Sequence, residues 1–390
     1  MLEQALKGSK RYYALIGFLL IIIIAGLAAY LQQLNYGLGV TGMSRDVTWG
    51  LYISQFTFMV GVAASAVMVA IPYYLHDHKA FGPIVILGEF LAVAAVVVCM
   101  LFVFVDLGQP ARVLNVILHP TPSSVMFWDL CVLAGYLLLN FVIGWMVLGA
   151  EKKGFPPPKW VKVLTYVAIP WAISIHTVTA FLYAGLPGRY YWMTAIMAAR
   201  FLSSAFAAGP ALLIILCLVL RRWTSFKTSV AAIQSLAKIV AYAMIANVFF
   251  FLLEVFTAFY SQIPGHMAAL TYLFAGIDGK DNLVPLMWCA ALLAITGITL
   301  LVIPKLRRNE KVLVAALAAV FMASWLDKSI GLVLGGFVPN AFGKVTEYIP
   351  SGIEIMIILG VYAVGLLLLT ILYKVVIAVR EQNAGFELDE

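Results

Sequence analysis

The sequence predicts an all-α membrane protein, a single polytopic bundle of about ten spanning helices with both termini in the cytoplasm. Of its 390 residues, 64% are hydrophobic and 11% are charged. The mean hydropathy of +1.01 is too high for the surface of a water-soluble domain. Lys and Arg are concentrated between long apolar runs, so the net charge of +7 indicates membrane topology and not nucleic-acid binding.

The apolar runs have the length of membrane helices, since about 20 residues cross roughly 30 Å of hydrocarbon. We therefore treat residues 1–390 as one integral membrane domain. Helices 1–4 occupy about 12–149 (12–34, 51–75, 82–106 and 126–149), helices 5–8 about 161–303 (161–185, 193–220, 231–260 and 284–303), and helices 9–10 about 311–379 (311–337 and 353–379).

The distribution of basic residues predicts the orientation. The two termini and the loops on their side hold 17 Lys and Arg residues, whereas the opposite loops hold only Arg45, Arg112, Arg189, Lys280 and Lys344. By the positive-inside rule the first side is cytoplasmic, in the cell membrane. The opposite, outer loops 35–50, 107–125, 261–283 and 338–352 are long, and ordered loops of that length commonly bind a partner.

Titratable side chains inside the spans are functional candidates, because a charge at the centre of a membrane helix costs at least about 2.5 to 3.5 kcal/mol. Helical rise places Glu89 and Lys238 about 10 Å from the cytoplasmic edge. The others lie in the outer half of the membrane: Asp106, Asp129, His176, Arg200, Glu254, Asp327, Lys328 and Glu354.

Structural interpretations stand beside the functional ones. Asp129, Glu354 and Lys238 lie near helix ends, where they can cap or snorkel. Asp327 and Lys328 point about 100° apart on a helix, so each needs a partner elsewhere, for function or for ion pairing. His176 could be a hydrogen-bonded core histidine.

Two further pairings follow from the cost of an isolated buried charge. Arg200 needs a buried anion, for which Asp106 and Glu254 are the candidates. Glu89 and Lys238 either begin a proton path from the cytoplasm or pair with each other.

The sequence offers no ligands for a redox cofactor. A haem held by two imidazoles needs two deep histidines, but His76, His78, His119 and His266 fall in loops or at edges. The four cysteines form no Cys-x-x-Cys motif. We therefore expect no haem, no iron–sulfur cluster and no metal site in this chain.

Several segments resemble the NrfD/PsrC family of quinone-interacting membrane subunits. They are 106–112 (Asp-Leu-Gly-Gln-Pro-Ala-Arg) with 122–128, 186–192 with 200–210, and the Trp49-Gly50 pair. Segments 42–49, 325–332 and 337–340 are most similar to the DsrP branch, found in DsrMKJOP complexes of sulfur and sulfate metabolism.

The resemblance implies a subunit that binds menaquinone or menaquinol near the outer face. It would exchange electrons with a ferredoxin-like iron–sulfur subunit docked on the outer loops, within a complex whose further subunits could include a membrane cytochrome b. The expected reactive residues are His176, Asp106, Arg200 and Glu254, because a buried imidazole is suited to exchange protons with a quinol hydroxyl. Trp192 and Tyr183 are further expected quinone contacts, and Glu89, Lys238, Asp327, Lys328 and Asp129 form the expected proton path.

Two other functions fit parts of the pattern. A transporter or proton channel could use the intramembrane charges, with helices 5 and 6 broken at Pro170 or Pro210 around a central site. A purely structural anchor would only tether an extracytoplasmic redox module. The crowding of charges towards one side argues against the first, and the buried His176 and Arg200 argue against the second.

Overall fold

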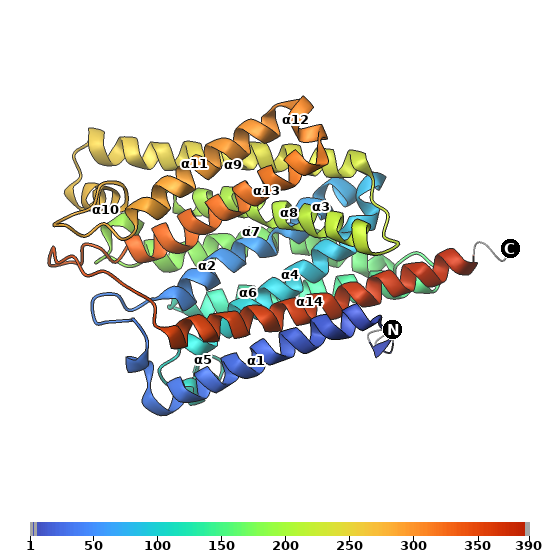
Figure 1. The fold of residues 1–390 in the computed structure, drawn as a ribbon, viewed down its shortest axis with the longest axis horizontal. Coiled ribbons are helices and arrows are strands. Elements are labelled where there is room, and N and C mark those ends of the chain that lie inside the picture. The colour runs from blue at the N-terminus through green and yellow to red at the C-terminus, as the bar shows by residue number, and fades with distance from the viewer. Residues whose placement is uncertain (1–2, 4–5, 387–390) are drawn as a thin grey trace.

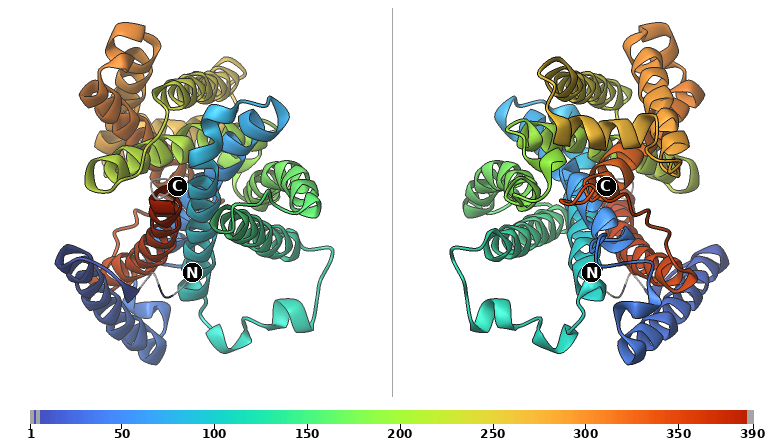
Figure 2. Two further views of the ribbon diagram at one scale, coloured as in Figure 1. Left: turned by 90° about the vertical axis from the view of Figure 1, so that its right-hand side faces the viewer. Right: turned by 90° about the vertical axis from the view of Figure 1, so that its left-hand side faces the viewer.

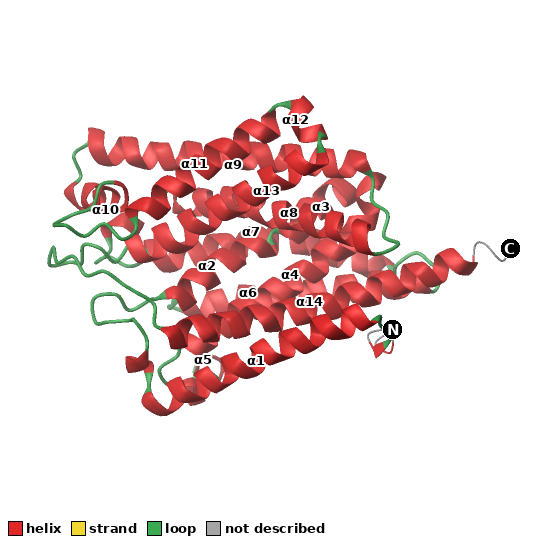
Figure 3. Cartoon of the chain, in the orientation of Figure 1, coloured by secondary structure: helices red, strands yellow, loops and turns green. Residues whose placement is uncertain are grey.

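The computed structural model describes residue 3 and residues 6–386. In this range the chain is helical, and its only β pairing is an isolated bridge between Ile277 and Lys280. Ten segments are long and apolar enough to cross a membrane, which confirms the predicted fold class and helix number. They lie side by side in one elongated bundle, with loops mainly at its two ends (Figure 3).

Seven spanning segments are single helices: α1 (Lys10–Tyr36), α6 (Val125–Lys152), α7 (Lys159–Ala184), α8 (Met197–Trp223), α9 (Val230–Tyr260), α11 (Val284–Val302) and α14 (Gly352–Phe386). Three are composite: α2 (Leu51–Ala63) with α3 (Ser65–Ala70) and the π-helix η3 (Ile71–Leu75), the 3-10 helix η4 (Lys79–Phe81) with α4 (Gly82–Asp106), and α13 (Glu310–Trp325) with the π-helix η7 (Leu326–Leu334). Short helices lie between them: η2 (Leu38–Val40), η5 (Pro110–Arg112), α5 (Asn115–Leu118), η6 (Tyr190–Trp192), α10 (Pro264–Phe274) and α12 (Pro304–Arg308).

The two ends of the bundle differ. Helix α1 begins and α14 ends at the same end, on the right in Figure 1. We call this the termini end. The segments preceding α2, η6 and α14, together with α10, gather at the opposite end, which we call the loop end.

Helices α2 and α4 form the centre of the bundle. Helix α4 packs against α2, α6 and α14, and is buried over most of its length. Its small and branched residues suit a helix that is apolar on every side. Helix α1 lies at the periphery along α14, as the two end-on views of Figure 2 show.

The structure corrects the predicted positions of helix breaks. Helices α7 and α8 continue through Pro170 and Pro210, since packing in a membrane bundle can compensate a proline inside a helix. The break occurs instead at Ala64, between α2 and α3. There Gly209 of α8 lies so close that an added Cβ would stand 2.9 Å from the backbone nitrogen of Ser65. A central substrate site built on broken helices 5 and 6 therefore loses its structural basis.

Candidate functional site

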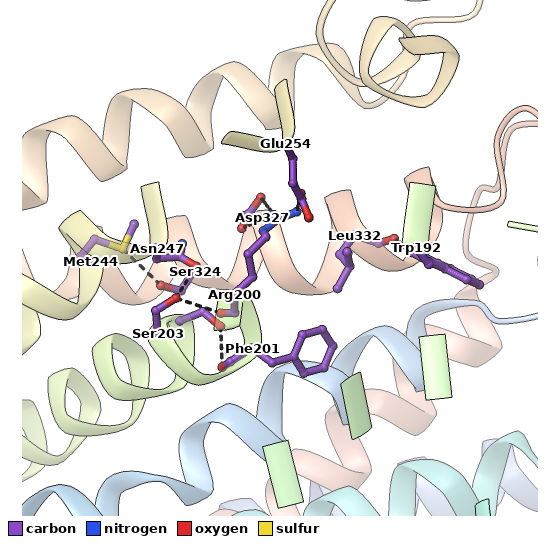
Figure 4. Close-up of polar contacts among 11 residues, drawn as sticks. Trp192, Arg200, Phe201, Ser203, Met244, Asn247, Glu254, Ser324, Asp327 and Leu332 are labelled. Carbon is purple, nitrogen blue, oxygen red and sulfur yellow. Dashed lines mark hydrogen bonds and ion pairs between the residues drawn. The ribbon is translucent and has the colours of Figure 1, made fainter. Parts of the chain in front are cut away.

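A buried ion cluster joins three helices in the loop-end half of the bundle. Arg200 of α8 forms an ion pair with Glu254 of α9, and its Nη2 atom lies 3.2 Å from both carboxylate oxygens of Asp327 in η7. Figure 4 shows the guanidinium lying against both carboxylates. Arg200 is 4% exposed and Glu254 is 8% exposed. The predicted partner Glu254 is confirmed, whereas the alternative partner Asp106 lies elsewhere, at the end of α4.

Lys328, the residue after Asp327, lines the same small cavity as Arg200 and Asp327. Its ammonium donates to the backbone oxygen of Phe201 at 3.4 Å and lies 4.2 Å from the centre of the Phe201 ring. Asp327 and Lys328 thus have different partners, as their divergent directions predicted. With Arg200, Glu254 and these two residues ionised, the cluster holds two positive and two negative charges, which limits the cost of its burial.

Asp327 and Lys328 both lie in η7, the π-helix that continues α13. π-Helical turns are rare in proteins, and those that occur inside α-helices are often found at functional sites. The predicted span 311–337 contained no sign of this winding, because its apolar pattern reads as one continuous helix. A small cavity of about 10 Å³ lies among Arg200, Asn247, Asp327 and Lys328, which is room for about one water molecule.

His176 lies next to this cluster, on α7. It is fully buried, and neither ring nitrogen has a hydrogen-bond partner in the described part of the chain. Lys328 is close enough to act on the imidazole electrostatically. The described residues therefore do not supply the hydrogen bonds that a satisfied core histidine would make.

Helix α7 presents three polar side chains on the same face, at spacings of three and seven residues. Beyond His176, Thr179 donates to Asp129 Oδ1 of α6 at 2.6 Å. Tyr183 forms a hydrogen bond with Thr57 of α2. Asp129 therefore does not point to solvent as a simple cap but joins α6 to the face that carries His176.

An aromatic cluster closes the site towards the loop end. Trp192 stacks on Trp49 at 5.7 Å between ring centres and meets Tyr183 and Phe337 edge-on at 5.0 Å. Tyr183 in turn lies 5.7 Å from Phe201, whose ring faces Lys328. The indole of Trp192 donates to the backbone oxygen of Leu332 at 2.8 Å, which fixes it to η7. The structure thus brings together the predicted Tyr183 and Trp192, and His176 lies seven residues before Tyr183 on the same helix.

Our site prediction omitted Trp49, Phe201 and Phe337. All three lie inside segments that carry the family resemblance, so the motifs held a signal for them. Arg189, from the same stretch as Trp192, places its guanidinium carbon 4.4 Å above the Phe337 ring. Its side chain also donates to the backbone oxygens of Phe337 and Asp46. The loops that carry these aromatic residues are thereby tied together.

Asp106 and Glu354 occupy a second polar region at the loop end, beside α1. Glu354 accepts hydrogen bonds from the Gly42 amide at 2.6 Å, the Ser351 amide at 2.9 Å and the Tyr348 hydroxyl at 2.7 Å. Its own amide donates to the Ser351 hydroxyl, which makes a capping box at the start of α14. The capping interpretation of Glu354 is confirmed.

Asp106 lies near this box without joining it. Its Oδ1 atom is buried and has no hydrogen-bond partner among the described residues. It acts electrostatically on the hydroxyls of Tyr52 and Tyr183. Asp106 is thus linked to the predicted site by its electrostatic effect on Tyr183, and not by an ion pair with Arg200.

Glu89 and Lys238, the two candidates predicted in the inner half of the membrane, lie in different environments. Glu89 of α4 is 2% exposed, whereas Lys238 is exposed on α9. No ion pair joins them within residue 3 and residues 6–386. The alternative in which they neutralise each other is therefore not supported by the structure.

Within the described residues, no group of three or more His, Cys, Asp or Glu side chains is placed to hold a metal ion. Cys99 and Cys217 are buried separately in the core. What the site does offer is a buried imidazole, two carboxylates, two cations and a wall of aromatic rings. An imidazole and carboxylates of this kind are the side chains that exchange protons with a bound group.

Comparison with known proteins agrees with this chemistry. The family described as "Polysulphide reductase, NrfD" matches residues 39–326. A protein of Halobacterium salinarum, provisionally named as a membrane subunit of dimethyl sulfoxide reductase, is 25% identical over 90% of this chain and 88% of its own length. The Hdr-like menaquinol oxidoreductase integral membrane subunit of Archaeoglobus fulgidus is 21% identical over 98% of this chain and 97% of its own.

A third relative is the integral membrane subunit of the menaquinone reductase of Nitratidesulfovibrio vulgaris, 21% identical over 94% of this chain and 91% of its own. The family match covers most of the described bundle, from the loop before α2 to the first residue of η7. It includes His176, Arg200 and Glu254. This chain belongs to the NrfD family of membrane proteins.

Proposed function

We propose that this protein is the quinone-reactive subunit of an oxidoreductase complex in the cytoplasmic membrane. It exchanges electrons between menaquinone or menaquinol, bound in the loop-end half, and a ferredoxin-like iron–sulfur subunit docked on the loop end. Oxidation of the quinol releases two electrons to that partner and two protons to nearby side chains. The names of two relatives, a menaquinol oxidoreductase subunit and a menaquinone reductase subunit, support the choice of quinone.

One observation carries the proposal. The imidazole of His176 is fully buried and unsatisfied among the described residues, and Lys328 of the charged cluster acts on it electrostatically. Holding a neutral imidazole without partners costs free energy, so a bound group that hydrogen-bonds to it accounts for its presence. A quinone oxygen is such a group, and in this proposal Tyr183 and Trp192 contact the quinone ring.

The ionisable neighbours have separate roles in this proposal. Arg200 and Glu254 set the local field, and Lys328, Asp327 and Asp129 carry protons between His176 and the loop end. Asp106, which acts on Tyr183, would take part from the α4 side. Lys238 is exposed on α9, which leaves Glu89 as the inner member of the proposed proton path.

The positive-inside bias supports a cytoplasmic termini end and an extracytoplasmic loop end. The segments similar to the DsrP branch support a complex of sulfur or sulfate metabolism. Further subunits, among them a membrane cytochrome b, would contact the sides of the bundle. The chain needs no haem or cluster of its own in this scheme, because the quinone delivers the electrons directly to the partner.

The decisive experiment is His176→Ala in the purified complex. We expect quinol-dependent reduction of the partner to fall about 10²-fold or more, the usual contribution of a general acid or base, with an altered pH profile. His119→Ala, on an exposed loop, is the matched control. An unchanged rate and pH profile in assembled His176→Ala complex would refute the assignment and leave the anchor interpretation.

A further inference from the structure

A large cavity opens at the termini end, opposite the proposed quinone site. Its volume is about 890 Å³. It lies between η3, the start of α4, the end of α6, the segment after α8 and the last turns of α14. Arg380 of α14 donates to Glu151 of α6 and to the backbone oxygen of Pro83, both at 2.7 Å, and holds this wall in place. A space of this size has room for many water molecules, at about 30 Å³ each.

Tyr74 separates this cavity from the interior. Its side chain lines the cavity, and its hydroxyl interacts with Thr165 of α7 and with the carboxyl charge of Glu89. Thr165 and Glu89 also line a second space of about 10 Å³, together with Asn140 and Tyr136. That space has room for about one water molecule. Tyr74 therefore lines the large cavity on one side and interacts with the buried carboxyl of Glu89 on the other.

Among the described residues, no ion pair joins Glu89 to a cation. It is 2% exposed, and its Oε2 atom has no hydrogen-bond partner in the part of the chain that the structure describes. Gly144 of α6 lets the neighbouring helix approach to the point where an added Cβ would stand 3.3 Å from the Cβ of Glu89. Burying an unpaired carboxylate in a membrane core is costly, so such a group takes up a proton readily, and buried carboxyls of this kind mark proton pathways.

A series of contacts leads from Glu89 towards the loop end of the bundle. Tyr136 acts electrostatically with Glu89, and its hydroxyl donates to the backbone oxygen of Ala63 at 3.4 Å. Ala63 is the last residue of α2 before the break at Ala64. Two residues earlier, Gly61 faces Lys328, whose Nζ atom would lie 3.3 Å from an added Cβ. The broken helix thus contacts both the Glu89 region and the charged cluster.

We propose that Glu89 is a proton-binding site loaded from the hydrated cavity at the termini end, with Tyr74 as the relay between the two. In the loading step a hydronium ion in the cavity gives up a proton and becomes water, and the Glu89 carboxylate becomes a carboxylic acid. The further step, delivery to quinone chemistry in the loop-end half, rests on the proposed function. The site gives that chemistry access to protons of the termini side.

Carbodiimide labelling tests the loading site without any quinone. A hydrophobic carbodiimide modifies a protonated carboxyl in an apolar setting, so mass spectrometry of the full chain should find Glu89 modified. Glu310, an exposed carboxylate at the termini end that pairs with Arg221, should remain unmodified. Absence of modification at Glu89 in folded protein would overturn the proposal.

Proton uptake during turnover tests the delivery step. The complex is reconstituted in vesicles with a pH indicator on the termini side. We expect Glu89→Gln to slow uptake about tenfold, Tyr74→Phe to slow it several-fold and Glu310→Gln to leave it unchanged. Quinone affinity, measured by tryptophan fluorescence, should be equal in all four proteins.

Unchanged uptake in assembled Glu89→Gln complex would refute the delivery step. If the wild-type complex bound no quinone, the proposed function would fail, and the labelling result would still decide the role of Glu89. The two failures are thus distinguishable.

Discussion

Arg200 Nη2 lies 3.2 Å from both carboxylate oxygens of Asp327, a residue 127 positions later in the chain. The same guanidinium pairs with Glu254, so one side chain links α8, α9 and η7 inside the membrane-spanning part of the bundle. Only arginine has a planar fork of donors that can serve two carboxylates in this way. The position and ionisation of the candidate site therefore depend on Arg200.

Replacing Arg200 by glutamine should destabilise the folded chain. The change leaves the carboxylates of Glu254 and Asp327 buried without their cation, a loss on the order of 3–5 kcal/mol for a broken buried pair. Thermal unfolding of the detergent-solubilised chain, followed by tryptophan fluorescence, should show a clearly lower midpoint. The triple variant Arg200→Gln, Glu254→Gln, Asp327→Asn should recover much of the loss, because it leaves no unpaired charge. Equal midpoints for the single and triple variants would contradict this account.

Glu354→Gln should loosen the segment between α1 and α2. The carboxylate is the acceptor for the amide of Gly42, and a hydrogen bond to a charged group is worth about 1.5–3 kcal/mol. We expect faster hydrogen exchange across residues 42–49 with little change in the core of α2. Tyr348→Phe is the comparison that keeps the charge of Glu354: it removes one of the three bonds to Glu354 and also the acceptor of the Leu51 amide at the start of α2. Exchange that is unchanged in Glu354→Gln would show that other contacts hold this segment.

The fold was largely predictable from the sequence, for a physical reason. Membrane helices need long apolar runs, so ten such runs gave the number and approximate bounds of the spans. Their ends were less predictable: the sixth span was placed at 193–220, but α8 begins at Met197 because Tyr190–Trp192 form a separate 3-10 turn. The break at Ala64 gave no signal, since it contains neither glycine nor proline and depends on the close approach of Gly209.

The candidate site was predictable in composition and only partly in geometry. Burial costs marked Arg200, Glu254 and Asp327 as residues that need partners, and two of these pairings are found. Hydropathy does not tell which helices are neighbours. For this reason Asp106 appeared to be an equal candidate for Arg200, and Lys238 an equal candidate for Glu89, although neither pair forms an ion pair among the described residues.

Asp46 should make the loop end sensitive to acid. The hydrogen bond from the Lys344 ammonium, with those from Thr346 and Asn340, lowers the pKa of Asp46 to about 2. The unfolded value is about 3.9, so the folded state binds this proton less readily. The stabilisation is therefore present above about pH 4 and is lost as the pH falls through about 2. Segments 42–49 and 338–346 should stay linked at pH 4 and separate near pH 2.

Hydrogen exchange of residues 338–346 checks this, with Asp46→Asn compared at each pH so that the intrinsic rate cancels. The variant should exchange faster than wild type at pH 5, and the difference should vanish near pH 2. A difference that persists unchanged at pH 2 would contradict the role of the Asp46 carboxylate.

The attachment of α1 to the bundle should depend on one glycine contact. Helix α1 packs mainly along α14, and an added Cβ at Gly26 would stand 2.6 Å from the Cα of Gly360, too close for any side chain. Gly17, on the same helix, has no atom within 4 Å of an added Cβ. Both substitutions to alanine raise helix propensity by about 1 kcal/mol, so they differ only in packing. Gly26→Ala should lower the thermal midpoint, since overpacking costs about 1–3 kcal/mol, whereas Gly17→Ala should leave it unchanged or raise it.

Gly26→Leu should detach α1 further and expose the face of α14 to labelling by a membrane-soluble probe. Equal midpoints for Gly26→Ala and Gly17→Ala would show that α1 is held by contacts other than this close approach.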